Sequence, residues 1–149
     1  MNSIFLDTNF FLDIFDVKRA RHTKAKACLV SLLDQNIVLY TSSDIISTIS
    51  YFLQKELSLE ACVRNIGFIV DEVTVLSADN SDFAALNNSI MEKLKEHNLK
   101  IDYEDCMQMY LAHKNNCQYL LTSDKRFCQE IKKEFSIEVI DLEYCVDEI

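Results

Sequence analysis

Short apolar runs alternate with longer stretches of helical periodicity along the whole chain. The runs predict β-strands, because three or four consecutive apolar residues suit a strand that is buried on both faces. They lie at residues 4–6, 37–40, 73–76, 119–122 and 137–140. The longer stretches carry apolar residues three and four positions apart, which predicts amphipathic helices. They cover residues 21–35, 44–56, 58–70, 82–97 and 102–115.

Strands that alternate with helices indicate βαβ units and a mostly parallel sheet covered on both faces. We therefore expect an α/β three-layer sandwich with four or five strands. The chain contains no proline and a single glycine, Gly67, and it shows no repeat, low-complexity segment or linker. We therefore expect residues 1–149 to form a single domain.

Composition places the protein among soluble proteins of a reducing compartment. No apolar run reaches the roughly 18–20 residues that a membrane span needs, and the first residues do not resemble a signal peptide. The six cysteines are scattered among apolar neighbours without a C-x-x-C pair, so we expect reduced core residues and neither disulfides nor a zinc site. The cytoplasm is the expected location.

The charge is acidic overall but basic in one segment. A net charge of −9 argues against binding nucleic acid through bulk electrostatics. Residues 18–26 nevertheless hold five of the 15 lysines and arginines and no acid. These are Lys18, Arg19, Arg21, Lys24 and Lys26. The segment is either a solvated helix face or a local contact for a phosphate chain.

Three aspartates are candidates for a shared site. Asp7 and Asp124 each follow an apolar strand, and ligands of parallel sheets bind beyond the carboxyl ends of the strands. Asp105 heads the apolar face of the helix predicted at 102–115, with Asp102 one turn earlier, whereas Glu104 is expected to point elsewhere. Taken singly, these acids have ordinary interpretations: Asp7 and Asp124 as helix caps, and Asp105 as a first-turn acid.

Carboxylates that converge repel each other unless a cation lies between them. Oxygen ligands without His or Cys favour Mg²⁺ or Mn²⁺, and these ions support phosphodiester hydrolysis. We therefore expect a divalent cation held by Asp7, Asp105 and Asp124.

Three segments that contain these aspartates resemble the motifs of the PIN domain family. They are "IFLDTNFFLDIF", "DYEDCMQMYLA" and "YLLTSDKRF", and the resemblance runs from Ile4 to about Ile140. It implies a twisted parallel sheet between helices and a ribonuclease that depends on Mg²⁺ or Mn²⁺. It assigns metal binding to Asp7, Asp105 and Asp124. It also implies that Asn9 orients the first acid, and that Thr122 and Ser123 lie near the last.

One position departs from that family's pattern. Thr48 occupies the place where the family normally has a second acid, on the helix after the second strand. Asp44, one turn earlier on the same face, or Asp102 are the candidates to replace it. Asp44 has a second interpretation, as a cap or first-turn acid.

The expected function is therefore metal-dependent endoribonuclease activity on RNA, with residues 18–26 guiding the RNA backbone. Many bacterial members of the family are VapC-like toxins, which implies an antitoxin protein as a partner and leaves a homodimer open. The alternative is a PIN-like module that binds RNA or protein without catalysis, which the missing acid at Thr48 favours.

Overall fold

The computed structural model describes residues 2–96, 102–124, 135 and 137–149. Its five strands form one parallel sheet in the order β3-β2-β1-β4-β5. The strands are β1 (Ser3–Leu6), β2 (Val38–Ser42), β3 (Thr74–Leu76), β4 (Tyr119–Leu121) and β5 (Glu138–Ile140). Each overlaps a predicted strand, so the expected number of strands and their parallel direction are confirmed.

The predicted helices are present among the described residues, together with two that the periodicity did not single out. The predicted ones are α2 (His22–Asp34), α3 (Ser43–Glu56), α4 (Leu59–Glu72), α5 (Asn80–Glu96) and α6 (Tyr103–Lys114). The additional ones are α1 (Thr8–Phe15) and α8 (Leu142–Glu148). Both are short, so neither offers enough turns for a clear apolar period.

Local sequence explains where several helices begin and end. The side chains of Ser42 and Ser58 cap α3 and α4 by accepting hydrogen bonds from backbone N–H groups three residues on. Asn36 and Asn116, just beyond α2 and α6, adopt positive φ angles of 55° and 57°. Asparagine tolerates this left-handed conformation, which ends many helices and which glycine more often supplies.

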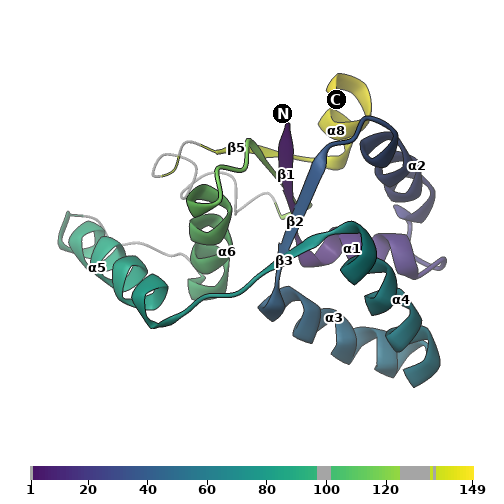
Figure 1. Cartoon of the computed structure of the whole chain (residues 1–149), viewed down its shortest axis with the longest axis horizontal. Helices are drawn as coiled ribbons and strands as arrows, with labels where there is room; N and C mark the ends of the chain where they lie inside the picture. Colours follow the sequence, from purple (N-terminus) through teal and green to yellow (C-terminus); the bar gives the residue numbers. More distant parts are fainter. Residues whose placement is uncertain (1, 97–101, 125–134, 136) are drawn as a thin grey trace.

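The order of the strands produces a switch point between β1 and β4. The chain moves outward from β1 through β2 to β3, then returns to place β4 on the other side of β1. In Figure 1, α5 and α6 lie to the left of β1 and β2, whereas α1, α2, α4 and α8 lie to the right. Connections that leave neighbouring strands on opposite faces open a crevice at the strands' carboxyl ends, and this is where ligands bind in such sheets.

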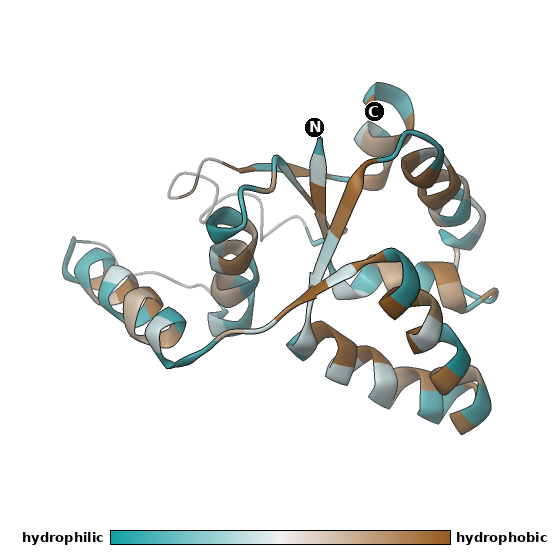
Figure 2. Ribbon diagram, viewed as in Figure 1, coloured by the Kyte–Doolittle hydropathy of each residue, from teal (hydrophilic) through white to brown (hydrophobic). Residues whose placement is uncertain are grey.

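The core follows the central strands. Residues 3–6 of β1 are all buried, and the brown colour of β1 and β2 in Figure 2 marks their apolar character. The cysteines at 28, 62, 106, 117 and 145 are buried and unbridged, as the sequence predicted, whereas Cys128 lies outside the described residues. Among the described residues, no helix is long and apolar enough to cross a membrane.

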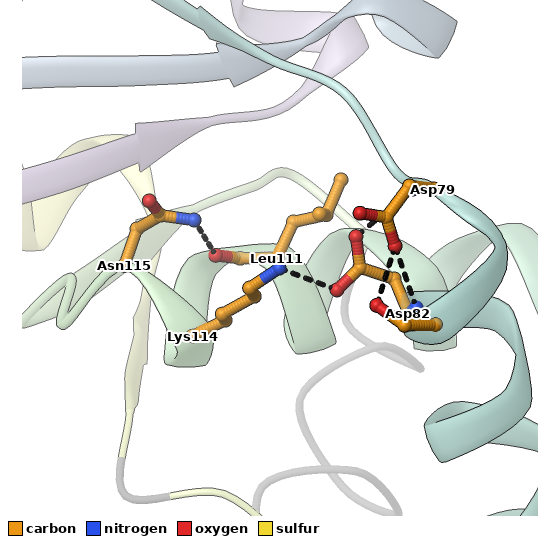
Figure 3. A network of polar contacts seen from close by, with 6 residues as sticks. Asp79, Asp82, Leu111, Lys114 and Asn115 are labelled. Carbon is orange, nitrogen blue, oxygen red and sulfur yellow. Dashed lines mark hydrogen bonds and ion pairs between the residues drawn. The ribbon is translucent and has the colours of Figure 1, made fainter.

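Helix α5 is linked to α6 by an ion pair as well as by apolar packing. Its buried residues are Asp82 and Leu86. The ammonium of Lys114 on α6 bonds to the Asp82 carboxylate at 2.6 Å, and the other Asp82 oxygen accepts from the backbone of Asp79 at 2.9 Å (Figure 3). The Lys114 hydrogen bond is the largest of the effects that hold the pKa of Asp82 below its usual range. The ion pair therefore adds to the apolar contact of Leu86, which belongs to the core.

We predict that Asp82→Ala loosens α5 without unfolding the sheet. The substitution removes the main partner of Lys114 and the carboxylate that accepts from Asp79. Hydrogen exchange measured by mass spectrometry should show faster exchange of the α5 amides, with β1 and β4 still protected. Asp71→Ala, which removes an exposed acid from α4, is the matched control. Unchanged protection of α5 would show that the ion pair does not anchor it.

Candidate active site

Strand register places Asp7 beside Thr122. Leu6 at the end of β1 pairs with Leu121 at the end of β4, and the backbone N–H of Asp7 donates to the Leu121 carbonyl at 3.1 Å. The residues that follow these strands, Asp7 and Thr122, therefore meet at the switch point. The sequence prediction that the carboxyl ends of these two strands share one edge is confirmed.

Thr122 links the two strand-end acids. Its hydroxyl, which is buried, donates to the Asp7 carboxylate at 2.7 Å and accepts from the backbone N–H of Asp124 at 3.1 Å. One side chain thus orients the first acid and fixes the turn that carries the last. Thr122 was expected near Asp124, and its bond to Asp7 is an addition from the structure. The role assigned to Asn9 stays a prediction.

The helix-cap interpretation of Asp7 is not supported. Asp7 stands at the N-cap position of α1, but its side chain makes no capping hydrogen bond. Burial raises the pKa of Asp7 and the charge of Asp124 adds to it, whereas hydrogen bonds from Thr122 and Thr8 act in the opposite direction. A partly buried carboxylate with another acid beside it is unfavourable for the fold.

Burial and neighbouring acids both act on Asp105. It lies in the first turn of α6, as the sequence predicted, and its backbone N–H donates to the capping carboxylate of Asp102 at 3.2 Å. The pKa of Asp105 is raised to about 7, mainly by burial and in smaller part by four neighbouring carboxylates. In order of effect these neighbours are Asp102, Asp7, Asp124 and Glu104.

Glu104 is a further acid whose charge acts on Asp105. Its own pKa is raised by burial and by the charges of Asp102, Asp44 and Asp7. Its side chain is exposed, and the prediction that it points away from the other acids stays a prediction. The helical spacing alone did not indicate this electrostatic link.

The two candidates for the vacant acid position lie in different surroundings. Asp44 is in the first turn of α3, and Ser42, not Asp44, supplies the cap. Thr48 donates its hydroxyl to the Asp44 carbonyl at 3.1 Å, within its own helix. Asp102 is engaged as the cap of α6. The charge of Asp102 acts on Asp105, as does that of Glu104. The charge of Asp44 acts on Glu104 instead.

The carboxylate oxygens of Asp7, Asp105 and Asp124 are suitable ligands for a hard divalent cation, although the three side chains do not form a compact ligand group in the structure. Carboxylates that repel one another at a strand edge are what Mg²⁺ or Mn²⁺ would neutralise. Within the described part of the chain, no three His, Cys, Asp or Glu side chains are close enough to form a ready metal site. Cation binding would therefore require these carboxylates to move closer together.

The basic residues at 18–26 differ in their surroundings: one is paired with a buried acid, two line a cavity near Asp124, and two are exposed elsewhere. Arg19 is committed to the fold, because its guanidinium bonds at 2.7 Å to Asp13, a carboxylate that is only 5% exposed. Arg21 and Lys24 instead line a cavity of about 590 Å³ that reaches Asp124, and Lys24 also pairs with Glu143 of α8. Lys18 and Lys26 are exposed away from this cavity.

Comparison with known proteins agrees with this geometry. Residues 3–126 match the family model described as "PIN domain". The ribonuclease VapC1 of Aquifex aeolicus (strain VF5) is 34% identical over 129 residues, which are 85% of this chain and 86% of that protein.

Solved structures share the fold at lower identity. VapC20 of Mycobacterium tuberculosis, a toxin that cleaves the sarcin-ricin loop, has a TM-score of 0.64 at 21% identity, over 89% of this chain and 95% of that one. The DNA-bound VapBC of Salmonella typhimurium has a TM-score of 0.70 at 19% identity, over 95% and 99%.

We predict that Asp105→Asn stabilises the metal-free protein in a pH-dependent way. A folded-state pKa near 7, above the usual carboxyl value, means that the native state loses stability as pH rises from about 4 to about 7. The variant escapes this loss. Its melting temperature, measured in EDTA, should therefore match the wild type near pH 4 and exceed it by several degrees at pH 8.

Asp71→Asn on α4 is the control for removing one negative charge far from the site. A difference in melting temperature between Asp105→Asn and wild type that is the same at pH 4 and pH 8 would contradict repulsion at Asp105.

Proposed function

The chain belongs to the PIN domain family, and from this premise we propose that it is a VapC-like ribonuclease that hydrolyses RNA with a bound Mg²⁺ or Mn²⁺ ion. The observation that carries the proposal is the gathering of mutually repelling carboxylates at the switch point of the sheet. Such a group destabilises the fold on its own account, so its presence calls for a functional reason.

Asp7, Asp105 and Asp124 are the residues that would hold the cation. They come from the ends of two neighbouring strands and from the first turn of α6, so three elements contribute one carboxylate each. A bound cation would lower the pKa of a water molecule and offset the charge that develops on the scissile phosphate. The two strand-end acids are oriented from within the protein by the Thr122 hydroxyl.

Glu104 is our candidate for the acid that the family pattern places at Thr48. Its charge acts directly on Asp105, whereas Asp44 acts on Glu104 from the facing helix, and Asp102 is occupied as a cap. Glu104 can therefore approach the site from α6 in place of a carboxylate on α3. Its exposure leaves the side chain free to turn toward a cation.

Arg21 and Lys24 are the basic residues best placed to receive the RNA backbone. Both line the cavity that ends at Asp124, so a phosphate held there lies next to the acids. Local contacts of this kind bind RNA without a positive surface overall, which reconciles the substrate with a net charge of −9. Lys18 and Lys26 would act at longer range.

We also propose an antitoxin protein as partner, because the relatives point to a toxin–antitoxin pair. VapC20 is described as a toxin, and the Salmonella assembly is a VapBC complex. A ribonuclease that acts on cellular RNAs requires such restraint.

We predict metal-dependent RNA cleavage that depends on Asp7. Wild type with Mn²⁺ should cleave RNA, EDTA should stop the reaction, and Asp7→Asn should slow it by about 100-fold or more, as expected for loss of one group that stabilises the reacting charge. Asp71→Asn, far from the site on α4, should retain the wild-type rate. Absence of cleavage across single-stranded and structured RNAs would favour the non-catalytic binding module.

We predict further that Glu104→Gln slows cleavage more than Asp44→Ala does. Asp44→Ala removes a first-turn acid, at a cost of about 0.3–1 kcal/mol in stability, and leaves the charges next to Asp105 in place. Single-turnover rates compare the two variants under identical Mn²⁺ concentrations.

Thr48→Glu, which restores an acid at the family position, should raise the rate or the Mn²⁺ affinity.

The opposite ranking, with Asp44→Ala inactive and Glu104→Gln active, would assign the fourth acid to α3 and contradict our choice.

A further inference from the structure

Gln108, in the middle of α6, is a buried amide without a hydrogen-bond partner. Its side chain is 2% exposed, and neither Oε1 nor Nε2 has a partner. It is the only side chain with buried unpartnered atoms among the described residues. Native proteins rarely leave such groups unpaired, because burial removes their bonds to water without replacing them.

Helix geometry places Gln108 on the side of α6 that faces the sheet. The opposite side is identified by its bonds to α5: Tyr103 donates to Asn87 at 2.7 Å, and Lys114 pairs with Asp82. At about 100° per residue, Gln108 lies roughly 120–140° around the axis from those two residues. It is only about 60° from Asp105, three positions earlier, and about 40° from buried Ala112.

The side chain of Gln108 also leans toward the acids. Side chains on an α-helix tilt toward its N-terminus, and residues three and four positions apart are neighbours along one face. Gln108 is three positions after Asp105 and four after Glu104, so this tilt directs its side chain toward the first turn, which carries both carboxylates. Helix geometry therefore points the unpaired amide toward the proposed cation site from its buried side.

We propose that Gln108 is a positioning residue of the cation site, an inference that rests on the proposed function. With the cation site occupied, Nε2 would donate to the Asp105 carboxylate and hold it in the orientation that binds the metal, and Oε1 would accept from a water in the site. Both amide atoms would then gain the partners that they lack in the structure. Groups in this position fix the orientation of a ligand, and their loss typically weakens metal binding by about 10–100-fold.

The decisive variant is Gln108→Met, which keeps the length and volume of the side chain and removes its polar atoms. Melting temperatures are measured for the full chain in EDTA and across a Mn²⁺ titration, because a ligand of the native state raises the melting point. Without metal, Gln108→Met should be as stable as wild type or more so. Its Mn²⁺ titration should require about 10–100-fold more metal, and its cleavage rate should fall.

Gln108→Glu supplies a readout of opposite sign. It has nearly the same shape but adds a carboxylate, so it should be less stable than wild type in EDTA at pH 8 and should show a larger Mn²⁺-induced rise in melting temperature. A residue with only a packing role would not move the Mn²⁺ response in opposite directions in the two variants. Met107→Leu, a buried substitution on a different side of α6, is the control and should titrate like wild type.

Equal Mn²⁺ titrations for wild type, Gln108→Met and Gln108→Glu would overturn the inference and leave the cation site intact. Lower metal-free stability of Gln108→Met would also overturn it, since the amide would then already have a partner such as a buried water. A wild type that shows no Mn²⁺ response would instead refute the cation of the proposed function. If Gln108→Met does not fold, Gln108→Leu replaces it with the same expectations.

Discussion

Repulsion among carboxylates at the carboxyl edge of β1 and β4 is the constraint around which this fold is arranged. Asp7, Asp105 and Asp124 come from separate elements, and burial together with the charge of neighbouring acids raises the pKa of Asp7 and of Asp105. The parallel register of β1 against β4 holds the strand-end acids at this edge despite that cost, with the Thr122 hydroxyl bonded to one and to the backbone of the other. The apolar strands beneath them provide the stability that offsets it.

The same protein uses charge in the opposite sense away from the site. Asp13 and Asp82 are buried, but each is paired with a cation, Arg19 and Lys114 respectively. These pairs link Arg19, in the segment after α1, to α1, and link α5 to α6. These two buried acids are therefore satisfied by cations of the chain. At the switch point, the charged groups that raise the pKa of Asp7 and Asp105 are other acids, and in the proposed function a metal ion would neutralise them.

The net negative charge of the protein is compatible with the proposed RNA substrate, because the proposed contacts to the RNA backbone are confined to one cavity. The cavity that links Arg21 and Lys24 to Asp124 brings two positive side chains within reach of the acids, while the remaining surface keeps its negative charge. Gln108 is a buried neutral amide three positions after Asp105 on α6. In the proposed function these groups have separate roles: the carboxylates bind the metal, the amide and the Thr122 hydroxyl orient them, and the two basic side chains bind the RNA backbone.

The sequence by itself determined the sheet and most helices, and it singled out the three acids of the proposed site. Apolar runs and helical spacing are local properties, and an acid at the end of a buried strand is visible without coordinates, as at Asp7 and Asp124. The tertiary structure alone decided which polar groups meet. The bond from Thr122 to Asp7 spans 115 residues, and the charges of Asp44 on α3 and of Asp7 after β1 both act on Glu104 of α6. Pairings between distant residues depend on register and helix placement, which no local pattern encodes.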